Sequence, residues 1–549
     1  MKAAELLVKC LENEGVRFLF GLPGEENLDM VEALRTSKIK FVVTRHEQGA
    51  AFMADIYGRL TGRAGVCMAT LGPGATNLIT GVADANMDRA PVVAITGQAD
   101  RKKEHKESHQ FIDVVNAFAP ITKWNTSIIH QDVIPEVVRK AFRVAELEKP
   151  GATHIELPEA VAEKEIKSAE YGEPIKAGPP PVSHADHASY HKAVELIKEA
   201  KNVLILAGNG IIRAKASEQL TAFAEANKIS VANTFMAKGA LSARHELFIA
   251  TIGMQAKDFV MCGFDRADLI ITIGYDLAEY APTYWNAENK KKIIHIDSQP
   301  AEIDQFYVPE VELIGNIKTS LLELTELTGF DKRFEYVDKL KDLHRDEYRI
   351  HKDSTDFPIK PQKILYDLRH ALADTDIVLS DVGMHKLWIA RTYPAYAPNT
   401  VLISNGFATM GIALPGALAA KLVHPERKVV AVMGDGGFLM NSQEIETAKR
   451  LGLAFVILIF HDNKYGMIEW KQINHFGGPP FAMEFTNPDF VKYAESFGCT
   501  GLRVERTEDL LPTLKKALEI DDVVIVDVPV DYSENFELTN KLGKLVCPI

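Results

Sequence analysis

Short runs of apolar, mostly β-branched residues recur along the chain, and stretches with helical periodicity separate them. Ten such runs are the candidate strands: 40–44, 65–69, 91–96, 203–206, 269–273, 292–296, 376–379, 428–433, 454–460 and 522–528. Strands that are apolar throughout, rather than alternating, are typical of parallel sheets with helices on both faces. The pattern therefore predicts an α/β protein of mostly parallel sheets flanked by helices.

Two polar breaks interrupt this pattern. The first contains Gly178-Pro-Pro-Pro181, and the second runs from about 328 to 361, through a highly charged helical stretch at 332–351. Consecutive prolines continue neither a helix nor a central strand, and 549 residues exceed what one hydrophobic core supports. We therefore expect three α/β domains, at 1–165, 188–328 and 362–532, followed by a C-terminal tail at 533–549.

Charge and composition narrow the class of protein. A formal charge of −13 argues against a nucleic-acid partner, which needs a basic face. No stretch approaches the ~18 uncharged apolar residues of a membrane span, and charges interrupt the N-terminal stretch as they would not in a signal peptide. The five cysteines form no CxxC pair, which favours reduced thiols. We expect a cytoplasmic enzyme.

The segment 428–463 carries the strongest chemical signal. One strand ends in Gly434-Asp435-Gly436-Gly437, with a helix expected from Ser442, and the next strand ends in His461-Asp462-Asn463. A glycine-rich turn before a helix offers backbone amides to a phosphate. Asp435 alone could simply cap a tight turn. A second carboxylate, 27 positions later (462 − 435), favours a diphosphate held through Mg²⁺, which takes one or two carboxylates plus phosphate oxygens.

The first predicted domain supplies a different element. Glu47 follows the strand at 41–44 and precedes a helix of small residues, and the turn Gly72-Pro-Gly-Ala-Thr-Asn77 opens another helix. Glu47 either stabilises its helix start through the macrodipole or is a buried carboxylic acid that exchanges a proton with a cofactor nitrogen. The residues alone leave both readings open.

These motifs together carry a family resemblance. Arg45-His-Glu47 with 72–77, and 434–436 with Asp462-Asn463, resemble the thiamine diphosphate enzymes of the acetolactate synthase and pyruvate oxidase superfamily. The resemblance covers the whole chain. It implies pyrimidine-binding, dinucleotide-binding-like and diphosphate-binding domains in that order. It also implies thiamine diphosphate and Mg²⁺ as cofactors, and a homodimer or homotetramer with active sites between subunits.

The resemblance also assigns roles to residues. Glu47 matches the catalytic glutamate at the aminopyrimidine N1′, and Met410 matches the bulky residue that bends the cofactor. Gln110 stands where synthases place a catalytic glutamine, although a solvated polar turn is the alternative. The implied cofactor contacts are Gly24, Glu47, Pro73, Asn77, Val382, Met384, His385, Ala408, Met410, Gly434, Gly436, Gly437, Tyr465 and Met467.

The implied metal ligands are Asp435, Asp462 and the backbone carbonyl of Lys464. The family motif commonly ends in two asparagines, so Asn463 remains an alternative to Asp462. The candidate substrate contacts are His109, Trp470 and Lys471. Trp470 could equally belong to a core at helical spacing, and Lys471 to a solvated helix face.

Within the family, the segment 274–282 resembles the FAD-free catabolic acetolactate synthases, and the Arg-Phe-Asp-Asp-Arg stretch of FAD-dependent biosynthetic enzymes is absent. The segment 381–385 looks more like the biosynthetic version, so both roles stay open and the catabolic one is favoured. Gly208-Asn-Gly210 lacks the third glycine of the dinucleotide fingerprint and indicates a strand–helix turn. FAD is not expected.

The implied activity is acetolactate synthesis from two pyruvates with loss of CO₂. A pyruvate oxidase-like enzyme and a simple 2-oxo acid decarboxylase are the alternatives within the superfamily. A non-catalytic nucleotide-binding regulator is the alternative from another class. Retention of Glu47 argues against the regulator, because a pure binder needs no proton-exchanging glutamate.

Overall fold

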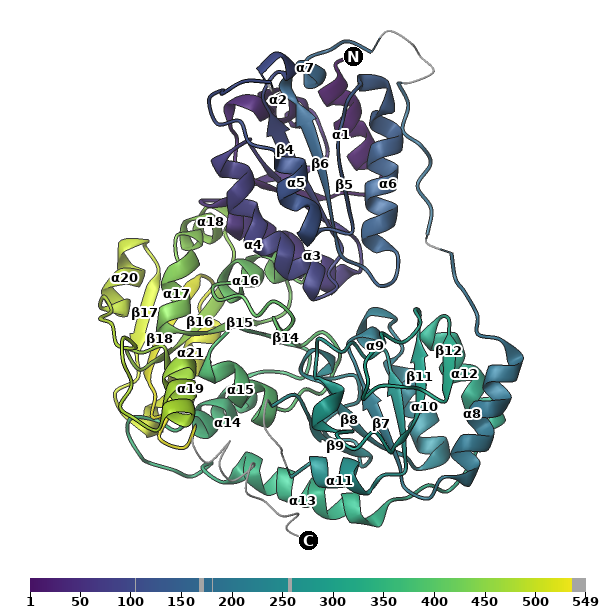
Figure 1. The fold of residues 1–549 in the computed structure, drawn as a ribbon. Helices are drawn as coiled ribbons and strands as arrows, with labels where there is room; N and C mark the ends of the chain where they lie inside the picture. Colours follow the sequence, from purple (N-terminus) through teal and green to yellow (C-terminus); the bar gives the residue numbers. More distant parts are fainter. Residues whose placement is uncertain (104, 167–171, 180, 255–258, 536–549) are drawn as a thin grey trace. The chain divides into compact units, whose positions relative to one another are not determined.

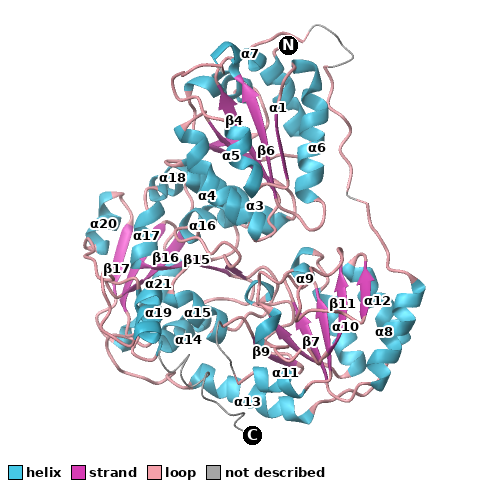
Figure 2. Ribbon diagram, viewed as in Figure 1, coloured by secondary structure: helices cyan, strands magenta, loops and turns pink. Residues whose placement is uncertain are grey.

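Three six-stranded parallel sheets follow one another along the chain (Figure 1). The computed structural model describes residues 1–103, 105–166, 172–179, 181–254 and 259–535. Helices flank the strands of every sheet (Figure 2). The predicted fold class is thereby confirmed.

The first sheet has the strand order β2-β1-β3-β4-β6-β5. Its strands are β1 (Phe18–Gly21), β2 (Lys40–Val43), β3 (Gly65–Ala69), β4 (Val92–Gln98), β5 (Trp124–Ser127) and β6 (Ala152–Pro158). Its helices are α1 (Ala3–Asn13), α2 (Leu28–Leu34), α3 (Glu47–Thr61), α4 (Pro73–Met87), α5 (Val114–Phe118), α6 (Ile134–Glu146) and α7 (Glu159–Ala162). Every residue of β3, β4 and β6 is buried, as central strands covered on both faces require.

The second sheet has the order β12-β11-β10-β7-β8-β9. Its strands are β7 (Val203–Ala207), β8 (Ser230–Asn233), β9 (Phe248–Thr251), β10 (Leu269–Ile273), β11 (Lys292–Asp297) and β12 (Val311–Ile314). The accompanying helices are α8 (His187–Glu199), α9 (Gly210–Arg213), α10 (Ser217–Asn227), α11 (Met261–Arg266), α12 (Ile317–Leu327) and α13 (Glu335–Arg349).

The third sheet has the order β14-β13-β15-β16-β18-β17, which repeats the topology of the first. Its strands are β13 (Ile377–Ser380), β14 (Val401–Ile403), β15 (Val429–Gly434), β16 (Phe455–His461), β17 (Thr500–Arg503) and β18 (Val523–Pro529). Its helices are α14 (Pro361–Ala371), α15 (Met384–Thr392), α16 (Ala413–Val423), α17 (Asp435–Asn441), α18 (Glu444–Leu451), α19 (Gly466–Phe476), α20 (Phe490–Ser496) and α21 (Leu510–Glu519).

All ten expected strands are present, with ends within two residues of their predicted positions. The helix expected from Ser442 is present as α18, which begins at Glu444. A separate short helix, α17, precedes it, and Asp435 and the two glycines after it form its first turn. The acidic side chain at that first turn suits a helix N-terminus.

The described chain packs as two compact units. The first comprises 1–181 together with 406–426 and 439–453, and the second comprises the remaining described residues. In the first unit α16 packs against α3. The two polar breaks therefore do not by themselves delimit the compact units, because the segments carrying α16 and α18 pack with the N-terminal sheet.

A buried ion cluster joins α3 to α4 within the first unit. Arg59 Nε lies 2.6 Å from Asp55 Oδ1, and its Nη2 lies 3.1 Å from Asp84 Oδ2 and 2.7 Å from Asp88 Oδ2. The three carboxylate side chains have no exposed surface. Burial raises the pKa of Asp55 above its usual range. The guanidinium is therefore needed to neutralise a set of carboxylates that water cannot reach.

The cysteines only partly follow expectation. Cys10, Cys67 and Cys499 are buried free thiols. Cys262, in contrast, is disulfide-bonded. The expectation that every cysteine is reduced was therefore wrong for Cys262. Among the described helices, none has the length and apolarity that crossing a membrane requires.

Candidate functional site

The carboxyl edge of the first sheet gathers the candidate residues of the N-terminal segment. Gly24 follows β1, Glu47 follows β2 and Pro73 follows β3, and these three strands are parallel neighbours. The chain leaves β1 and β3 towards opposite ends of the sheet, since β2 lies on one side and β4 on the other. Ligands of open α/β sheets bind in the crevice at such a switch point.

Glu47 is the first residue of α3 and is 9% exposed. Its Oε2 accepts a hydrogen bond of 2.9 Å from Asn77 Nδ2, so two residues named from the sequence are in direct contact. A Cβ added to Gly74 would lie 3.3 Å from Glu47 Oε1. The Gly72-Pro73-Gly74 turn thus allows α4 to approach the carboxylate closely while Asn77 orients it.

Gln110 lies against the same turn. A Cβ on Gly72 would lie 2.5 Å from the carbonyl oxygen of Gln110, and both residues have positive φ, 51° and 57°. Gln110 and its neighbour His109 are exposed. The structure therefore places the backbone of Gln110 against the turn that begins α4.

Glu444 on α18 was missed by sequence reasoning. It is fully buried, and its Oε1 accepts backbone hydrogen bonds of 3.0 Å from Arg45 and from His46, the residues that precede Glu47. Its Oε2 accepts a bond of 2.6 Å from Thr447 Oγ1, and burial raises the pKa of Glu444. The available signal was an acid on the apolar face of a helix. Glu444 fixes the backbone from which Glu47 projects.

The loop that carries Ala408 and Met410 belongs to the first unit. Thr409 Oγ1 donates a 2.6 Å hydrogen bond to Asp84 Oδ1, and the carbonyl of Gly411 accepts one of 3.2 Å from Asn441 Nδ2. Ala408 has a φ of 57°, which is uncommon for a residue other than glycine. Met410 is half-buried. Neighbouring hydrogen bonds thus hold the loop in a constrained conformation.

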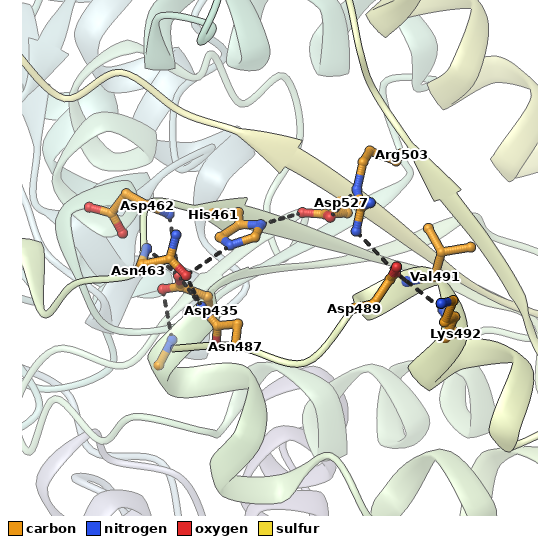
Figure 3. A network of polar contacts seen from close by, with 11 residues as sticks. Asp435, His461, Asp462, Asn463, Asn487, Asp489, Val491, Lys492, Arg503 and Asp527 are labelled. Carbon is orange, nitrogen blue, oxygen red and sulfur yellow. Dashed lines mark hydrogen bonds and ion pairs between the residues drawn. The ribbon is translucent and has the colours of Figure 1, made fainter. Parts of the chain in front are cut away.

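In the second unit, Asp435 lies at the centre of a hydrogen-bond network (Figure 3). The residue is 1% exposed. Its Oδ2 accepts bonds from the backbone of Asn463 (2.6 Å) and of Asp462 (3.2 Å) and from Asn487 Nδ2 (2.9 Å). Its Oδ1 accepts a 2.9 Å bond from the amide of Gly436. Burial raises the pKa of Asp435, so the carboxylate is costly without a cation.

Asp462 stands next to it, directly after β16. Burial, followed by the charges of Asp435 and Glu469, raises the pKa of Asp462 to about 7. Two neighbouring desolvated carboxyls disfavour joint ionisation unless a cation compensates them. The donor set therefore suits Mg²⁺, which completes its shell with phosphate oxygens and water. Within the described chain no group of three or more His, Cys, Asp or Glu could hold a metal alone.

The side chain of Asn463 points into the polar network instead. Its Oδ1 accepts a 2.9 Å hydrogen bond from Asn487 Nδ2 and lies 3.2 Å from His461 Nε2. Its φ of 59° turns the chain sharply at this position. These contacts favour Asp462 over Asn463 as the second metal ligand. Lys464 follows in the same segment, where its amide helps to lower the pKa of the Asp462 carboxyl.

A glycine-lined cradle adjoins the carboxylate pair. A Cβ on Gly436 would lie 2.9 Å from the Tyr465 ring, and one on Gly434 would lie 3.3 Å from the imidazole of His385. Val382, Met384 and His385 follow β13, the parallel neighbour of β15 at the switch point of the third sheet. Gly437 lies in the first turn of α17.

The surroundings of His385 indicate whether a diphosphate fits this cradle. The residue is 2% exposed, and its Nε2 is buried without a hydrogen bond to any residue that the structure describes. Burial lowers the pKa of His385 to about 3, so its ring is neutral. An unsatisfied buried polar group costs about 1–3 kcal/mol. In the tautomer that carries its hydrogen on Nε2, the ring would donate to a phosphate oxygen and remove that cost, so the residues fit the group.

A cavity of 680 Å³ opens beside Asp462. Its wall includes Lys464, Glu469 and Trp470, together with the segment 529–533. This volume falls in the range of small-molecule sites. Of the proposed substrate residues, Trp470 lines this cavity, whereas Lys471 is exposed and is not part of its wall. Met467 is half-buried in the same helix, α19.

Sequence reasoning also missed the residues that support the network. His461 Nδ1 lies 2.8 Å from Asp527 Oδ1, and Arg503 Nε lies 2.9 Å from Asp527 Oδ2 (Figure 3). The hydrogen bond to Asp527 raises the pKa of His461. Asp527 was visible as a lone acid in the apolar strand β18. Asn487 lies in an irregular segment where no periodicity marks it.

The whole chain is similar to known proteins. Residues 1–117, 190–324 and 381–528 match, respectively, the N-terminal TPP binding domain, the central domain and the C-terminal TPP binding domain of thiamine pyrophosphate enzymes. The chain is 37% identical to an acetolactate synthase of Bacillus subtilis (strain 168), over 99% of the chain and 96% of the relative. It is 36% identical to a catabolic acetolactate synthase of Raoultella terrigena, over 98% and 97%. It is also 36% identical to a probable acetolactate synthase large subunit of Methanocaldococcus jannaschii, over 99% and 94%.

Proposed function

We propose that this protein makes 2-acetolactate, because the chain belongs to the acetolactate synthase family of thiamine pyrophosphate enzymes. It decarboxylates one pyruvate and transfers the resulting hydroxyethyl unit to a second pyruvate, releasing CO₂. Full-length similarity to enzymes of that name is the observation that carries the proposal. Thiamine diphosphate, when bound, supplies the electron sink that makes the decarboxylation feasible.

The third sheet would hold the diphosphate end through Mg²⁺. Asp435, Asp462 and the backbone carbonyl of Lys464 are the protein ligands in this proposal. Gly434 and Gly436 would leave room for the phosphates, and the Nε2–H tautomer of the neutral His385 ring would donate to a phosphate oxygen. The buried and mutually destabilising carboxyls support this assignment, because a divalent cation removes the repulsion between them.

Glu47 would hold and exchange a proton at the pyrimidine N1′. Its burial and its hydrogen bond to Asn77 fix the direction of the carboxylate. Glu444 holds the backbone in front of it, so the acid is presented by a rigid element. Gly24 and Pro73 lie at the same sheet edge and shape this end of the site.

Substrate contacts follow from the remaining positions. Gln110 is proposed to orient a substrate oxygen, with His109 beside it. Trp470 provides an apolar wall of the 680 Å³ cavity. An apolar wall excludes water, and a dry site favours loss of CO₂ because the carboxylate charge disperses in that step. Lys471 is proposed only as a rim contact, since its exposed side chain lies outside the wall.

The enzyme is proposed to work without FAD, as a catabolic enzyme. The turn 208–210 after β7, where a dinucleotide phosphate would bind, is filled by the protein's own Glu279. The carboxylate accepts bonds of 3.0 and 3.2 Å from the amide of Asn209 and a further bond from Thr234 Oγ1. Burial, and secondly Asp276, raises the pKa of Glu279. A phosphate would have to displace this carboxylate and lose its backbone donor.

Two measurements test the cofactor assignment. Protein stripped with a chelator should lose activity and regain it with Mg²⁺ plus thiamine diphosphate, without added flavin. A flavin absorption spectrum in the pure protein, with activity lost when the flavin is removed, would contradict the FAD-free proposal. Acetolactate as product supports the proposed reaction, whereas acetaldehyde or acetyl phosphate supports the decarboxylase or oxidase alternative. The absence of any product would support the non-catalytic regulator.

The ligand assignment is tested by alanine substitution. Asp462→Ala should weaken cofactor binding as severely as Asp435→Ala, because each removes a charge that neutralises Mg²⁺. Asn463→Ala should have a much smaller effect, because its side chain faces His461 and Asn487. A tolerant Asp462 variant beside a damaged Asn463 variant would transfer the ligand role to Asn463.

We further propose that the active sites lie between subunits of at least a homodimer. Co-expression of Glu47→Gln and Asp435→Asn chains distinguishes the arrangements. Shared sites leave one intact site in each mixed dimer, so about a quarter of wild-type activity should return. Sites confined to single subunits would return none.

A further inference from the structure

A second cavity, of 420 Å³, lies in the second unit. Its wall is formed by parts of β8 and β9 with the loop between them, by α13, and by the turn 392–396 after α15. None of the residues assigned above to metal, cofactor or substrate is among its described wall residues. The cavity is therefore not part of the site already described.

The wall of this cavity is basic, in a chain whose formal charge is −13. Its charged and imidazole side chains are Lys238, Arg244, His245, Glu246, Lys341, His344, Arg345 and Arg349. Three of the cations form ion pairs, Arg244 with Asp374, Lys341 with Asp338 and Arg345 with Asp342. The Arg244 and Arg345 pairs are exposed, and exposed ion pairs are weak and rearrange readily. Five cations face Glu246 and the three pairing aspartates, which leaves one positive charge in excess at the wall.

Two of these cations have no acidic partner. Arg349, the last residue of α13, forms no ion pair with any described residue. Lys238 is 5% exposed, and its Nζ donates only to neutral oxygens, the Ala390 carbonyl at 3.0 Å and Thr251 Oγ1 at 3.2 Å. Burial, and secondly the charge of Arg391, lowers the pKa of Lys238 to about 7. A buried ammonium without a counter-charge is unfavourable, and an anion in the cavity would relieve it.

Tyrosines complete the wall. The Tyr348 hydroxyl is buried and makes no hydrogen bond within the described part of the chain, which leaves a donor available to a ligand. Tyr393 and Tyr396 line the same cavity, with the Arg244 guanidinium 3.6 Å from the centre of the Tyr396 ring. Cations and neutral donors from the β8–β9 loop, from α13 and from the segment 392–396 line one cavity, which suits a group with several oxygens. Arginine forks in particular match the geometry of phosphate.

We propose that this cavity binds a small phosphate-bearing anion, held by Lys238, Arg349 and the Tyr348 hydroxyl. The other cations form its rim and attract the ligand. A volume of 420 Å³ accommodates inorganic phosphate or a phosphate monoester. A carboxylate lacks the third oxygen that these converging groups can use.

The test uses the full-length holoenzyme saturated with thiamine diphosphate and Mg²⁺, so that phosphate does not compete for the cofactor site. Titration calorimetry with inorganic phosphate, adenosine monophosphate and acetate separates free phosphate, an ester and a carboxylate that is not the proposed substrate. We expect saturable binding of phosphate or of the ester, one per chain. Lys238→Met and Arg349→Gln should each weaken it by about tenfold or more, as expected for a lost charge-assisted hydrogen bond.

The matched control is Arg35→Gln. Arg35, like Arg349, is exposed at the C-terminal end of a helix, but it lies in the first unit. It should change the affinity by no more than about twofold, as a surface charge does. Arg349 is exposed, so its variant folds even if loss of buried Lys238 disturbs the domain. Absence of saturable phosphate binding, unchanged affinity in Arg349→Gln, equal loss in Arg35→Gln, or binding of acetate alone would each overturn the proposal.

Discussion

Replacing Asn487 by Ala should weaken the binding of thiamine diphosphate and Mg²⁺ by about 10–100-fold. One amide, Nδ2, donates to Asp435 Oδ2 and to Asn463 Oδ1, both at 2.9 Å. The bond to the buried carboxylate is worth about 1.5–3 kcal/mol, and every 1.4 kcal/mol is a factor of ten in affinity. Alanine leaves Asp435 in place but removes the group that orients it towards the metal.

The assay is a thiamine diphosphate titration at fixed Mg²⁺, followed by activity and by the fluorescence of Trp470, which lines the adjacent cavity. At saturating cofactor the turnover should return to near the wild-type value, because Asn487 orients a metal ligand and is not assigned a contact with the substrate. Asn474→Ala, an exposed asparagine on α19, is the control and should bind normally.

Two results would refute this reasoning. If Asn487→Ala binds the cofactor with wild-type affinity, the bridging bonds do not support the metal ligand. If turnover at saturation falls while affinity is unchanged, Asn487 acts on the reaction itself and not through Asp435.

Two further predictions concern the first unit. Glu47→Gln should fold and bind the cofactor but slow C2 proton exchange by about 10²–10⁴-fold; unchanged exchange, measured by quenched NMR, would remove Glu47 from the mechanism. Arg59→Met should lower stability by about 3–5 kcal/mol, because it leaves the carboxylates of Asp55, Asp84 and Asp88 buried and uncompensated. Burial raises the pKa of Asp55, and this sets the pH dependence of the variant's stability. Protonation of Asp55 relieves the repulsion among the three carboxylates in the folded state, so the stability deficit of Arg59→Met should grow as pH rises. A deficit in urea midpoint that is constant between pH 5 and 8 would contradict this.

The strands that sequence reasoning found are those whose hydrophobic pattern is unambiguous. Central strands such as β10 and β15 are almost wholly buried and read as continuous apolar runs. The edge strand β5, Trp124–Ser127, is half-buried and polar in three of its four positions, so it resembles a loop. The short helix α17 was not expected from the sequence, because it begins with two glycines after Asp435 and glycine is a poor helix former.

The residues of the candidate site also differ in whether the local sequence pattern marks them. Glu47 and Asp435 were predictable, because each follows an apolar strand and adjoins a glycine-rich turn. Glu444 and Asn487 were not, since their roles depend on contacts 399 (444 − 45) and 52 (487 − 435) positions away in sequence. A local pattern records which groups can react. It does not record which distant side chain orients them.

Glu279 satisfies the strand–helix turn of the central domain with a side chain of the protein itself. The carboxylate accepts hydrogen bonds from the Asn209 amide, so this amide is satisfied without any bound molecule. The arrangement would be hard to convert into a phosphate site. Removing Glu279 alone would orphan the Asn209 amide and the Thr234 hydroxyl and leave Asp276 nearby to repel a phosphate. An attempt to engineer a nucleotide site into this sheet must therefore change both acids together.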